Sequence, residues 1–171
     1  MRSRNKRIVS LFLSLALVLS VFLIPTGEKV FAEEASVKNV TIVHVNDIHG
    51  RIKEDDYDGM GFTRMATKVN QLKEENPNLI LLNAGDTIHG LPIVTVSKGE
   101  TMIKIMNEMK FDAMAPGNHD FNYGYDRLVE LRDIAEFPIL AANIVKEDGT
   151  RDFEAYTIKE LDGVNVGIFG L

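Results

Sequence analysis

The stretch Leu79–Asn83, LILLN, followed by Gly85 and Asp86, decides the fold class of this sequence. Its apolar run is short and carries no charge, which is typical of a strand buried on both faces of a sheet. Apolar residues recur with helical spacing on both sides of it, over Phe62–Glu75 and Glu100–Met109. The methionines of the second helix are interpreted as core packing rather than as metal ligands. A buried strand between two helices indicates βαβ units, and therefore an α/β fold with a largely parallel sheet.

The same alternation continues in both directions from that strand. Further strands are predicted at Val40–Val45, Phe111–Ala115 and Pro138–Ala142, and a further helix at Tyr125–Ala135. Two more apolar runs flank an Asp-Gly dipeptide, which favours a tight turn and so predicts a β-hairpin. These runs are Glu154–Glu160 and Val164–Phe169. We therefore expect mainly one βαβ-built sheet, with a hairpin in the last part of the sequence.

Composition excludes several classes of function. The chain has 171 residues, which bounds it at one domain or part of one, and a net charge of −6. Five of its 19 basic side chains precede residue 33, but only one of its 25 acidic side chains does. Residues 33–171 therefore carry a net charge of −10. Binding to a nucleic-acid polymer through a basic surface is therefore not expected. The chain has no cysteine, so any metal must be held by oxygen and imidazole ligands.

The first part of the chain has the pattern of a secretory signal peptide. A cationic segment at residues 2–7 precedes an apolar run at Ile8–Ile24, and Val30-Phe31-Ala32 supplies a cleavage site before Glu33. The alternative is an uncleaved membrane anchor, because about 17 apolar residues is the lower limit for spanning a bilayer. We expect residues 1–32 to be removed, which leaves no stable membrane span and a protein that is secreted, periplasmic or held at the cell surface.

Acidic, amide and imidazole side chains follow three of the predicted strands. The motifs, in chain order, are NDIHG at residues 46–50, NAGDT at residues 83–87 and PGNHD at residues 116–120. The carboxyl ends of parallel strands lie at one edge of a sheet, where ligands approach. A single Asp or Asn-His pair in such a place is more often a turn former or a helix cap. Three such strand ends in succession favour a metal site instead.

Four of these side chains are candidate metal ligands. Asp47 and His49 lie two residues apart and can offer one oxygen and one nitrogen to a single cation. Asp86 has two carboxylate oxygens and can bridge two cations about 3.5–4 Å apart. Asn118 adds a neutral amide oxygen. Mixed ligands of this kind accept several divalent metals, so the sequence does not choose among Zn, Mn, Fe, Co and Mg.

The segments VNDIHG, NAGDTIHG and APGNHDFNYG resemble the first three motifs of the calcineurin-like metallophosphoesterases. Within that family they are most similar to the secreted bacterial branch of 5′-nucleotidases and 2′,3′-cyclic-nucleotide phosphodiesterases. The resemblance implies an α/β/β/α sandwich, of which this chain supplies the N-terminal part. It also implies a hydrolase that uses two divalent metal ions, Zn, Mn or similar, to cleave nucleotide phosphoesters with water.

The family's site residues transfer to this sequence one by one. By that resemblance, Asp47 and His49 bind the first metal, Asp86 bridges the two metals, and Asn118 serves the second. His119 is then the catalytic residue, which contacts the scissile phosphate or protonates the leaving oxygen. An imidazole suits this role because its ordinary pKa lets it donate a proton near neutral pH.

One position departs from the family pattern. In the 5′-nucleotidase branch an Asp three residues after the catalytic His orients that imidazole, whereas this chain has Asn122. An amide can hydrogen-bond the ring but brings no charge. The change is more similar to the cyclic-phosphodiesterase side of the family, so the choice between the two substrates stays open. Asp120 is a less favoured substitute, because adjacent side chains point in different directions. His44 is expected to pack within its strand, and His89 to line the cleft as a loop residue.

Two further features of the family are absent from this sequence. They are the later metal-binding histidines, in G-H and G-H-x-H motifs, and the C-terminal domain that recognises the nucleoside. We therefore expect residues 33–171 to be a metallophosphoesterase domain truncated at its C-terminal end, with little activity by itself. We also expect an apolar patch around Leu79–Leu82, because the strands of the first sheet would lose part of their cover. Two alternatives remain open: a hydrolase of the same superfamily with a sulfur-ester substrate, and a non-catalytic, truncated or decayed surface protein.

Overall fold

The computed structural model describes residues 37–54 and 59–171. The expected signal peptide, residues 1–32, lies outside the described residues. Residues 38–171 form one compact unit. Within the described ranges, none of the helices has the length and apolar character needed to cross a membrane.

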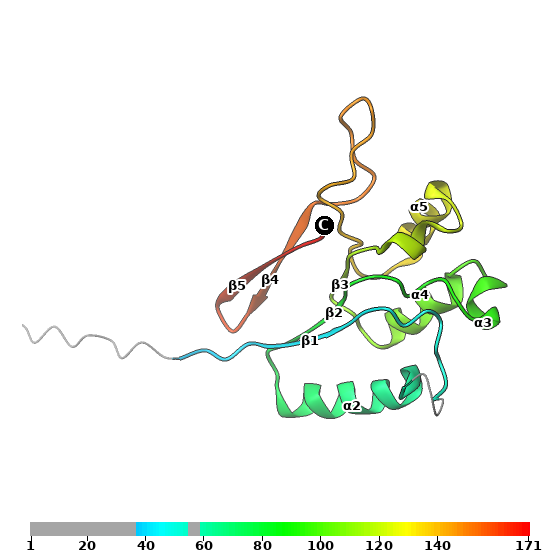
Figure 1. Ribbon diagram of the computed structural model, residues 1–171. Helices are drawn as coiled ribbons and strands as arrows, with labels where there is room; N and C mark the ends of the chain where they lie inside the picture. Colours follow the sequence, from blue (N-terminus) through cyan, green and yellow to red (C-terminus); the bar gives the residue numbers. More distant parts are fainter. Residues whose placement is uncertain (1–36, 55–58) are drawn as a thin grey trace, which may run out of the picture. The chain divides into compact units, whose positions relative to one another are not determined.

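A parallel sheet of three strands organises this unit (Figure 1). The strands are β1 at Thr41–Val45, β2 at Leu79–Asn83 and β3 at Ala113–Met114, and they lie in the order β1-β2-β3. Thr41 pairs with Leu79 and Val45 with Asn83, so β1 and β2 end at the same edge of the sheet. The α/β fold class and the βαβ organisation are therefore confirmed.

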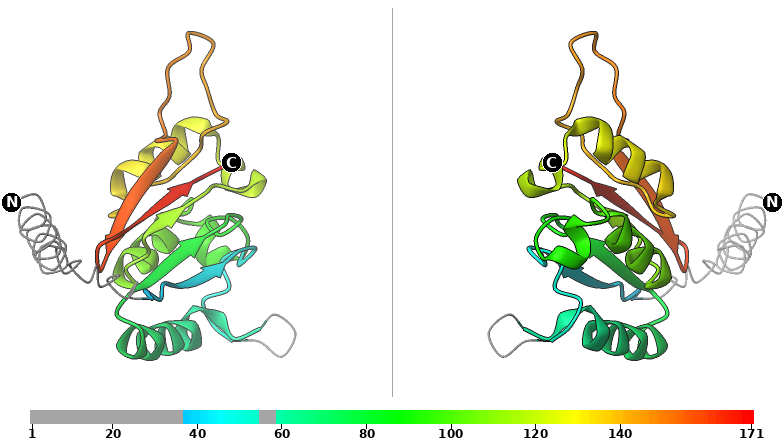
Figure 2. Two further views of the ribbon diagram at one scale, coloured as in Figure 1. Left: turned by 90° about the vertical axis from the view of Figure 1, so that its left-hand side faces the viewer. Right: turned by 90° about the vertical axis from the view of Figure 1, so that its right-hand side faces the viewer.

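The helices cover one face of this sheet (Figures 1 and 2). They are α2 at Gly61–Glu75, the short α3 at Pro92–Thr95, α4 at Glu100–Glu108, a 3₁₀ helix η1 at Asn118–Phe121, and α5 at Tyr125–Ile134. The predicted ends of the three long helices were correct to within one residue. Their apolar faces meet alternate side chains of the strands in one core, which includes Phe62, Val69, Leu79, Leu81, Met102, Ile103, Met106, Leu128 and Leu131. The α4 methionines are packing residues, as the sequence predicted.

The antiparallel hairpin lies against the other face of the sheet (Figure 2). It consists of β4 at Tyr156–Leu161 and β5 at Val164–Phe169. Two ion pairs attach it, one between Lys159 and Asp112 and one between Lys38 and Asp162, whose Nζ and Oδ2 atoms are 2.6 Å apart. The predicted hairpin is therefore confirmed.

The expected strand at Pro138–Ala142 is not formed as a strand. It contributes single bridges, from Ile139 to Met114 and from Leu140 to Glu154. Proline has no N–H to donate, so pairing at Pro138 depends on its carbonyl, which accepts from the Met114 N–H at 3.0 Å. The segment then passes from the sheet to the hairpin, where the Ala142 N–H donates to Gly170 O at 2.7 Å.

The exposure of β2 also differs from the prediction. Leu79 is 6% exposed, and Ile80 and Leu81 are fully buried, so these residues do not form the apolar patch expected around Leu79–Leu82. The prediction was wrong for these three residues because β2 is the central strand, with helices over one face and the hairpin over part of the other; Leu82 stays partly exposed.

Exposed apolar side chains also lie on the hairpin. Tyr156, Ile158 and Phe169 are 61–66% exposed and belong to both of its strands. On the first sheet, Ile42 of the edge strand β1 is 57% exposed.

His44 differs from its prediction as well. It is exposed rather than packed, as is Ile42 on the same side of β1, whereas Val43 and Val45 on the other side pack against the core. Together with Ile42, Leu82 and Ile168 it lines an apolar groove of about 260 Å³ between the sheet and β5.

Candidate metal centre

The loops that follow β1 and β2 are held together by backbone hydrogen bonds. The Ala84 N–H donates to Val45 O at 2.8 Å, the Asp47 N–H to Gly85 O at 3.0 Å, and the His49 N–H to Asp86 O at 2.9 Å. The parallel pairing of the two strands thus continues beyond their ends. This continuation places the first two sequence motifs side by side.

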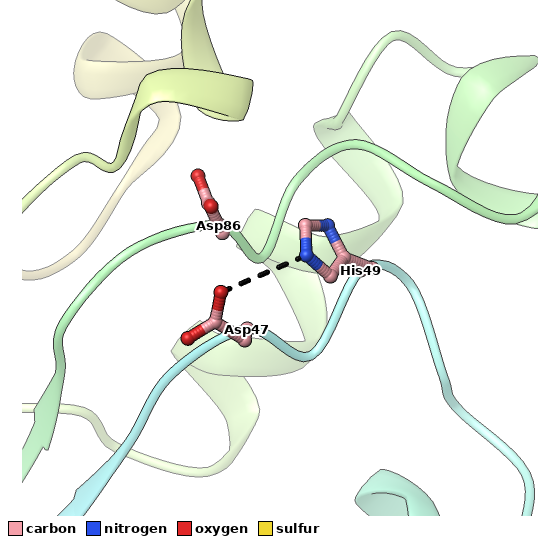
Figure 3. A group of neighbouring side chains, drawn as sticks. All are labelled: Asp47, His49 and Asp86. Atoms are coloured by element: carbon pink, nitrogen blue, oxygen red, sulfur yellow. Dashed lines mark ion pairs between the residues drawn. The ribbon is translucent and has the colours of Figure 1, made fainter. Parts of the chain in front are cut away.

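Three of the four predicted metal ligands meet at this point (Figure 3). Asp47, His49 and Asp86 each offer one ligand atom, and these atoms all lie within 4.8 Å of one another. His49 Nε2 lies 3.8 Å from Asp47 Oδ1. Two carboxylates and one imidazole form a donor set that suits divalent cations such as Zn²⁺ and Mn²⁺. The residues present therefore fit the metal that the motifs predict.

The backbone at all three ligands adopts a left-handed conformation. The φ angles are 55° at Asp47, 50° at His49 and 55° at Asp86. Such angles are uncommon for residues other than glycine, although Asp, Asn and His tolerate them best. Backbone conformations of this kind cluster at functional sites, where the surrounding structure holds them in place.

The third motif approaches the same place from the end of β3. Asn118, the fourth predicted ligand, begins η1. The next residue, His119, donates its backbone N–H to Asp86 Oδ1 at 2.8 Å. The turn that carries Asn118 is therefore attached directly to the carboxylate of Asp86. The assignment of Asn118 to a second metal stays a prediction.

The imidazole of His119 lies beside this group and is exposed. Its ring centroid is 5.3 Å from that of His49 and 5.9 Å from that of His89, whose ring is nearly parallel to it at 13°. Asn122 Nδ2 lies 2.9 Å from His119 Nδ1. The position that departs from the family pattern thus still contacts the imidazole, and His89 lies beside the ring.

Comparison with known proteins identifies the family. A family model described as calcineurin-like phosphoesterase matches residues 40–169. The chain belongs to the calcineurin-like phosphoesterase family. It therefore belongs to a family of metal-dependent hydrolases, as the three motifs indicated.

Relatives of this phosphoesterase include several nucleotidases. The 5′-nucleotidase of Vibrio vulnificus is 34% identical over 152 residues, which cover 86% of this chain and 27% of that protein. The 5′-nucleotidase of Homo sapiens is 40% identical over 121 residues, which cover 64% of this chain and 21% of that protein. Among solved structures, the NAD nucleotidase NadN of Haemophilus influenzae matches with a TM-score of 0.70 and 29% identity, over 77% of this chain and 26% of that chain. The chain thus spans between a fifth and a third of the length of these relatives.

Two polar residues that were not among the predicted site residues fix the turn after β2 of the phosphoesterase. Asn83 is 2% exposed and Thr87 is fully buried. Asn83 Oδ1 accepts from the Gly85 N–H at 2.8 Å, and Asn83 Nδ2 donates to Thr87 Oγ1 at 2.8 Å. The sequence signal for this turn is Asn83, a polar residue at the end of an otherwise apolar strand.

Asp120 does not take the place of the family's orienting carboxylate. Its side chain is 1% exposed and bonds to backbone N–H groups of two loops, not to the His119 imidazole. Burial raises the pKa of the Asp120 carboxyl above its ordinary value, and the N–H donors around it oppose that rise. Asn122, not Asp120, contacts the ring.

Proposed function

We propose that this phosphoesterase hydrolyses nucleotide phosphoesters with water, as a 5′-nucleotidase or as a 2′,3′-cyclic phosphodiesterase with 3′-nucleotidase activity. The observation that carries the proposal is the meeting of Asp47, His49 and Asp86 within 4.8 Å beside His119. The nucleotidases among the relatives support the choice of a nucleotide as substrate.

The proposed ligands divide between two divalent cations. Asp47 and His49 would hold the first, Asn118 would hold the second, and Asp86 would be shared between them. When bound, these cations would neutralise phosphate oxygens and make water a stronger nucleophile near neutral pH. The acidic and imidazole groups that the structure gathers are of the types that such cations prefer.

His119 is proposed to act on the leaving group. Its Nδ1 atom contacts Asn122, so Nε2 is the atom that would react: the protonated ring would give its Nε2 proton to the oxygen that leaves the phosphate and become neutral. The ring of His89 lies nearly parallel to that of His119, with the two centroids 5.9 Å apart. A positioned imidazole of this kind contributes about 10²–10⁴-fold to rate.

We also propose that the protein acts outside the cytoplasm. The support is the order of the N-terminal sequence, a cationic segment, an apolar run and Val30-Phe31-Ala32. N-terminal sequencing of the mature protein should find Glu33 as its first residue, and an intact Met1 would favour the membrane anchor instead.

The function is tested with the protein expressed from its complete reading frame. After loading with Mn²⁺ or Zn²⁺, phosphate release is measured from AMP and from 2′,3′-cyclic AMP, and sulfate release from a thiosulfate ester. We expect turnover of at least one nucleotide, and its loss in Asp47→Asn. Asp148→Asn is the control, because this exposed aspartate bonds to Thr150 in a separate turn. Hydrolysis of the thiosulfate ester alone would favour the sulfur-ester alternative, and binding of no cation would favour a non-catalytic protein.

A further inference from the structure

Asp120 is a buried carboxylate that joins two of the loops at the candidate metal centre. Its Oδ2 accepts from the backbone N–H of Asp86 at 2.8 Å and from that of Gly117 at 2.9 Å. Its Oδ1 accepts from the N–H of Thr87 at 2.9 Å and from that of Ile88 at 3.0 Å. The side chain thus takes three donors from the loop after β2 and one from the loop after β3.

All four of these partners are donors. A protonated carboxyl group would need an acceptor for its own hydrogen, and these contacts provide none, so they match the ionised form. The three successive N–H groups of Asp86, Thr87 and Ile88 point toward one place because Asp86 has a left-handed backbone, with φ of 55°. Successive N–H groups in such a turn form a concave anion site, and here the anion is the carboxylate of Asp120.

The same contacts fix the side chain of Asp86. A left-handed conformation is unfavourable for a residue with a β-carbon, and charge-assisted hydrogen bonds from its own N–H and the next two offset that cost. On the far side, Asp86 Oδ1 accepts from the His119 N–H at 2.8 Å. Asp86 is therefore held through its backbone by Asp120 and through its carboxylate by the residue just before Asp120.

We infer that Asp120 is a positioning residue. By accepting hydrogen bonds from the N–H groups of Asp86, Thr87 and Ile88, it sets the direction of the Asp86 carboxylate. The inference rests on the proposed function in so far as Asp86 is a metal ligand. It assigns to Asp120 an effect on metal affinity, beyond an effect on the stability of the fold.

The test compares Asp120→Asn with the wild-type chain. The asparagine has nearly the same shape, but its NH₂ group faces two N–H donors instead of accepting from them. Mn²⁺ affinity, measured by calorimetry, should fall by about 10–100-fold, as is typical when a partner of a metal ligand is removed. Hydrogen exchange at the amides of residues 86–88, measured without metal, should become about tenfold faster. Asp148→Asn is the control, because it makes the same chemical change at an exposed aspartate that bonds to Thr150 in a separate turn, and it should leave both quantities unchanged.

A second variant keeps the inference testable if Asp120→Asn does not fold. A β-carbon at Gly117 would overlap Asp86 Oδ1 and crowd the Asp86 N–H, so Gly117→Ala displaces the same carboxylate and disturbs the contacts of Asp120 while leaving the Asp120 side chain itself in place. Unchanged Mn²⁺ affinity in either folded variant would overturn the inference. If the wild-type chain itself binds no Mn²⁺, the proposed function fails, but hydrogen exchange at residues 86–88 still tests the positioning role. Unchanged exchange in Asp120→Asn overturns that role, and faster exchange supports it.

Discussion

Asn122 Nδ2 lies 2.9 Å from His119 Nδ1, so a neutral amide holds the imidazole beside the candidate metal centre. This contact spans three residues of one short turn, which begins in η1. It occupies one ring nitrogen, so the reactive role that we propose for His119 falls to the other. The ring can therefore be oriented without a carboxylate at this position.

Replacing His119 by alanine should separate catalysis from metal binding. We expect His119→Ala to lower kcat by about 10²–10⁴-fold, because it removes the proposed proton donor. Bound Mn²⁺, measured by elemental analysis, should be unchanged. Loss of the metal together with activity would show that His119 is a ligand, which would contradict its assignment.

Replacing Asn122 should have a smaller effect than replacing His119. Asn122→Ala removes the contact at Nδ1 and should lower kcat by about tenfold with little change in KM, because the ring is misoriented but present. Asn122→Asp puts a carboxylate where it can accept from Nδ1, so the ring stays oriented and kcat should hold to within a few-fold. Equal losses in the two variants would argue against an orienting role.

Asp47→Asn should weaken metal binding without weakening the fold. Asparagine tolerates the left-handed backbone at this position, and the side chain is exposed. Mn²⁺ affinity should fall by more than about 100-fold, because substitution of a residue that only supports a metal ligand already lowers affinity by roughly 10–100-fold. Thermal unfolding of the metal-free variant should match that of the metal-free wild type, and Asp148→Asn should change neither quantity.

Acid stability should depend on Asp152. A hydrogen bond from Lys146 and a second from Tyr125 lower the pKa of the Asp152 carboxyl. Its stabilisation is therefore complete above the ordinary aspartate pKa of about 3.9 and is lost as the pH falls from there through the lowered folded-state pKa. Lys146→Met should move the midpoint of acid unfolding to higher pH. Lys68→Met, on an exposed position of α2, serves as the control and should not move it.

The outward face of the hairpin should promote association of the chain. Tyr156, Ile158 and Phe169 are exposed there, and contiguous apolar surface favours contact between molecules. Ile158→Lys should reduce the apparent mass measured by sedimentation at high protein concentration, with no loss of thermal stability. Asn165→Lys adds the same charge to the same hairpin and should have a weaker effect. Equal effects of the two lysines would point to charge rather than to the apolar face.

Much of the fold followed from the sequence because its signals are local. The apolar run of β2 and the helical spacing of α2 and α4 were enough to predict the βαβ order. Three strand-end motifs were enough to predict that Asp47, His49 and Asp86 would meet, because parallel strands end at one edge.

The features that the sequence did not predict depend on contacts between distant segments. The direction of the Asp120 side chain is set by N–H groups more than 30 residues away, and adjacency to His119 gives no sign of it. His44 is exposed because it lies on the side of β1 away from the helices, and the segment Pro138–Ala142 does not form a strand because it pairs partly with β3 and partly with the region of the hairpin.

Gly85 lets the loops after β2 and β3 approach each other without a spacer. Its φ is 96°, and a β-carbon there would overlap the backbone of Gly117 in the neighbouring loop. The two loops therefore touch backbone to backbone at Gly85 and Gly117, with no side chain between these two residues. The substitution Gly85→Ala would push the two loops apart, and it would separate Asp86 from His119 without altering either residue.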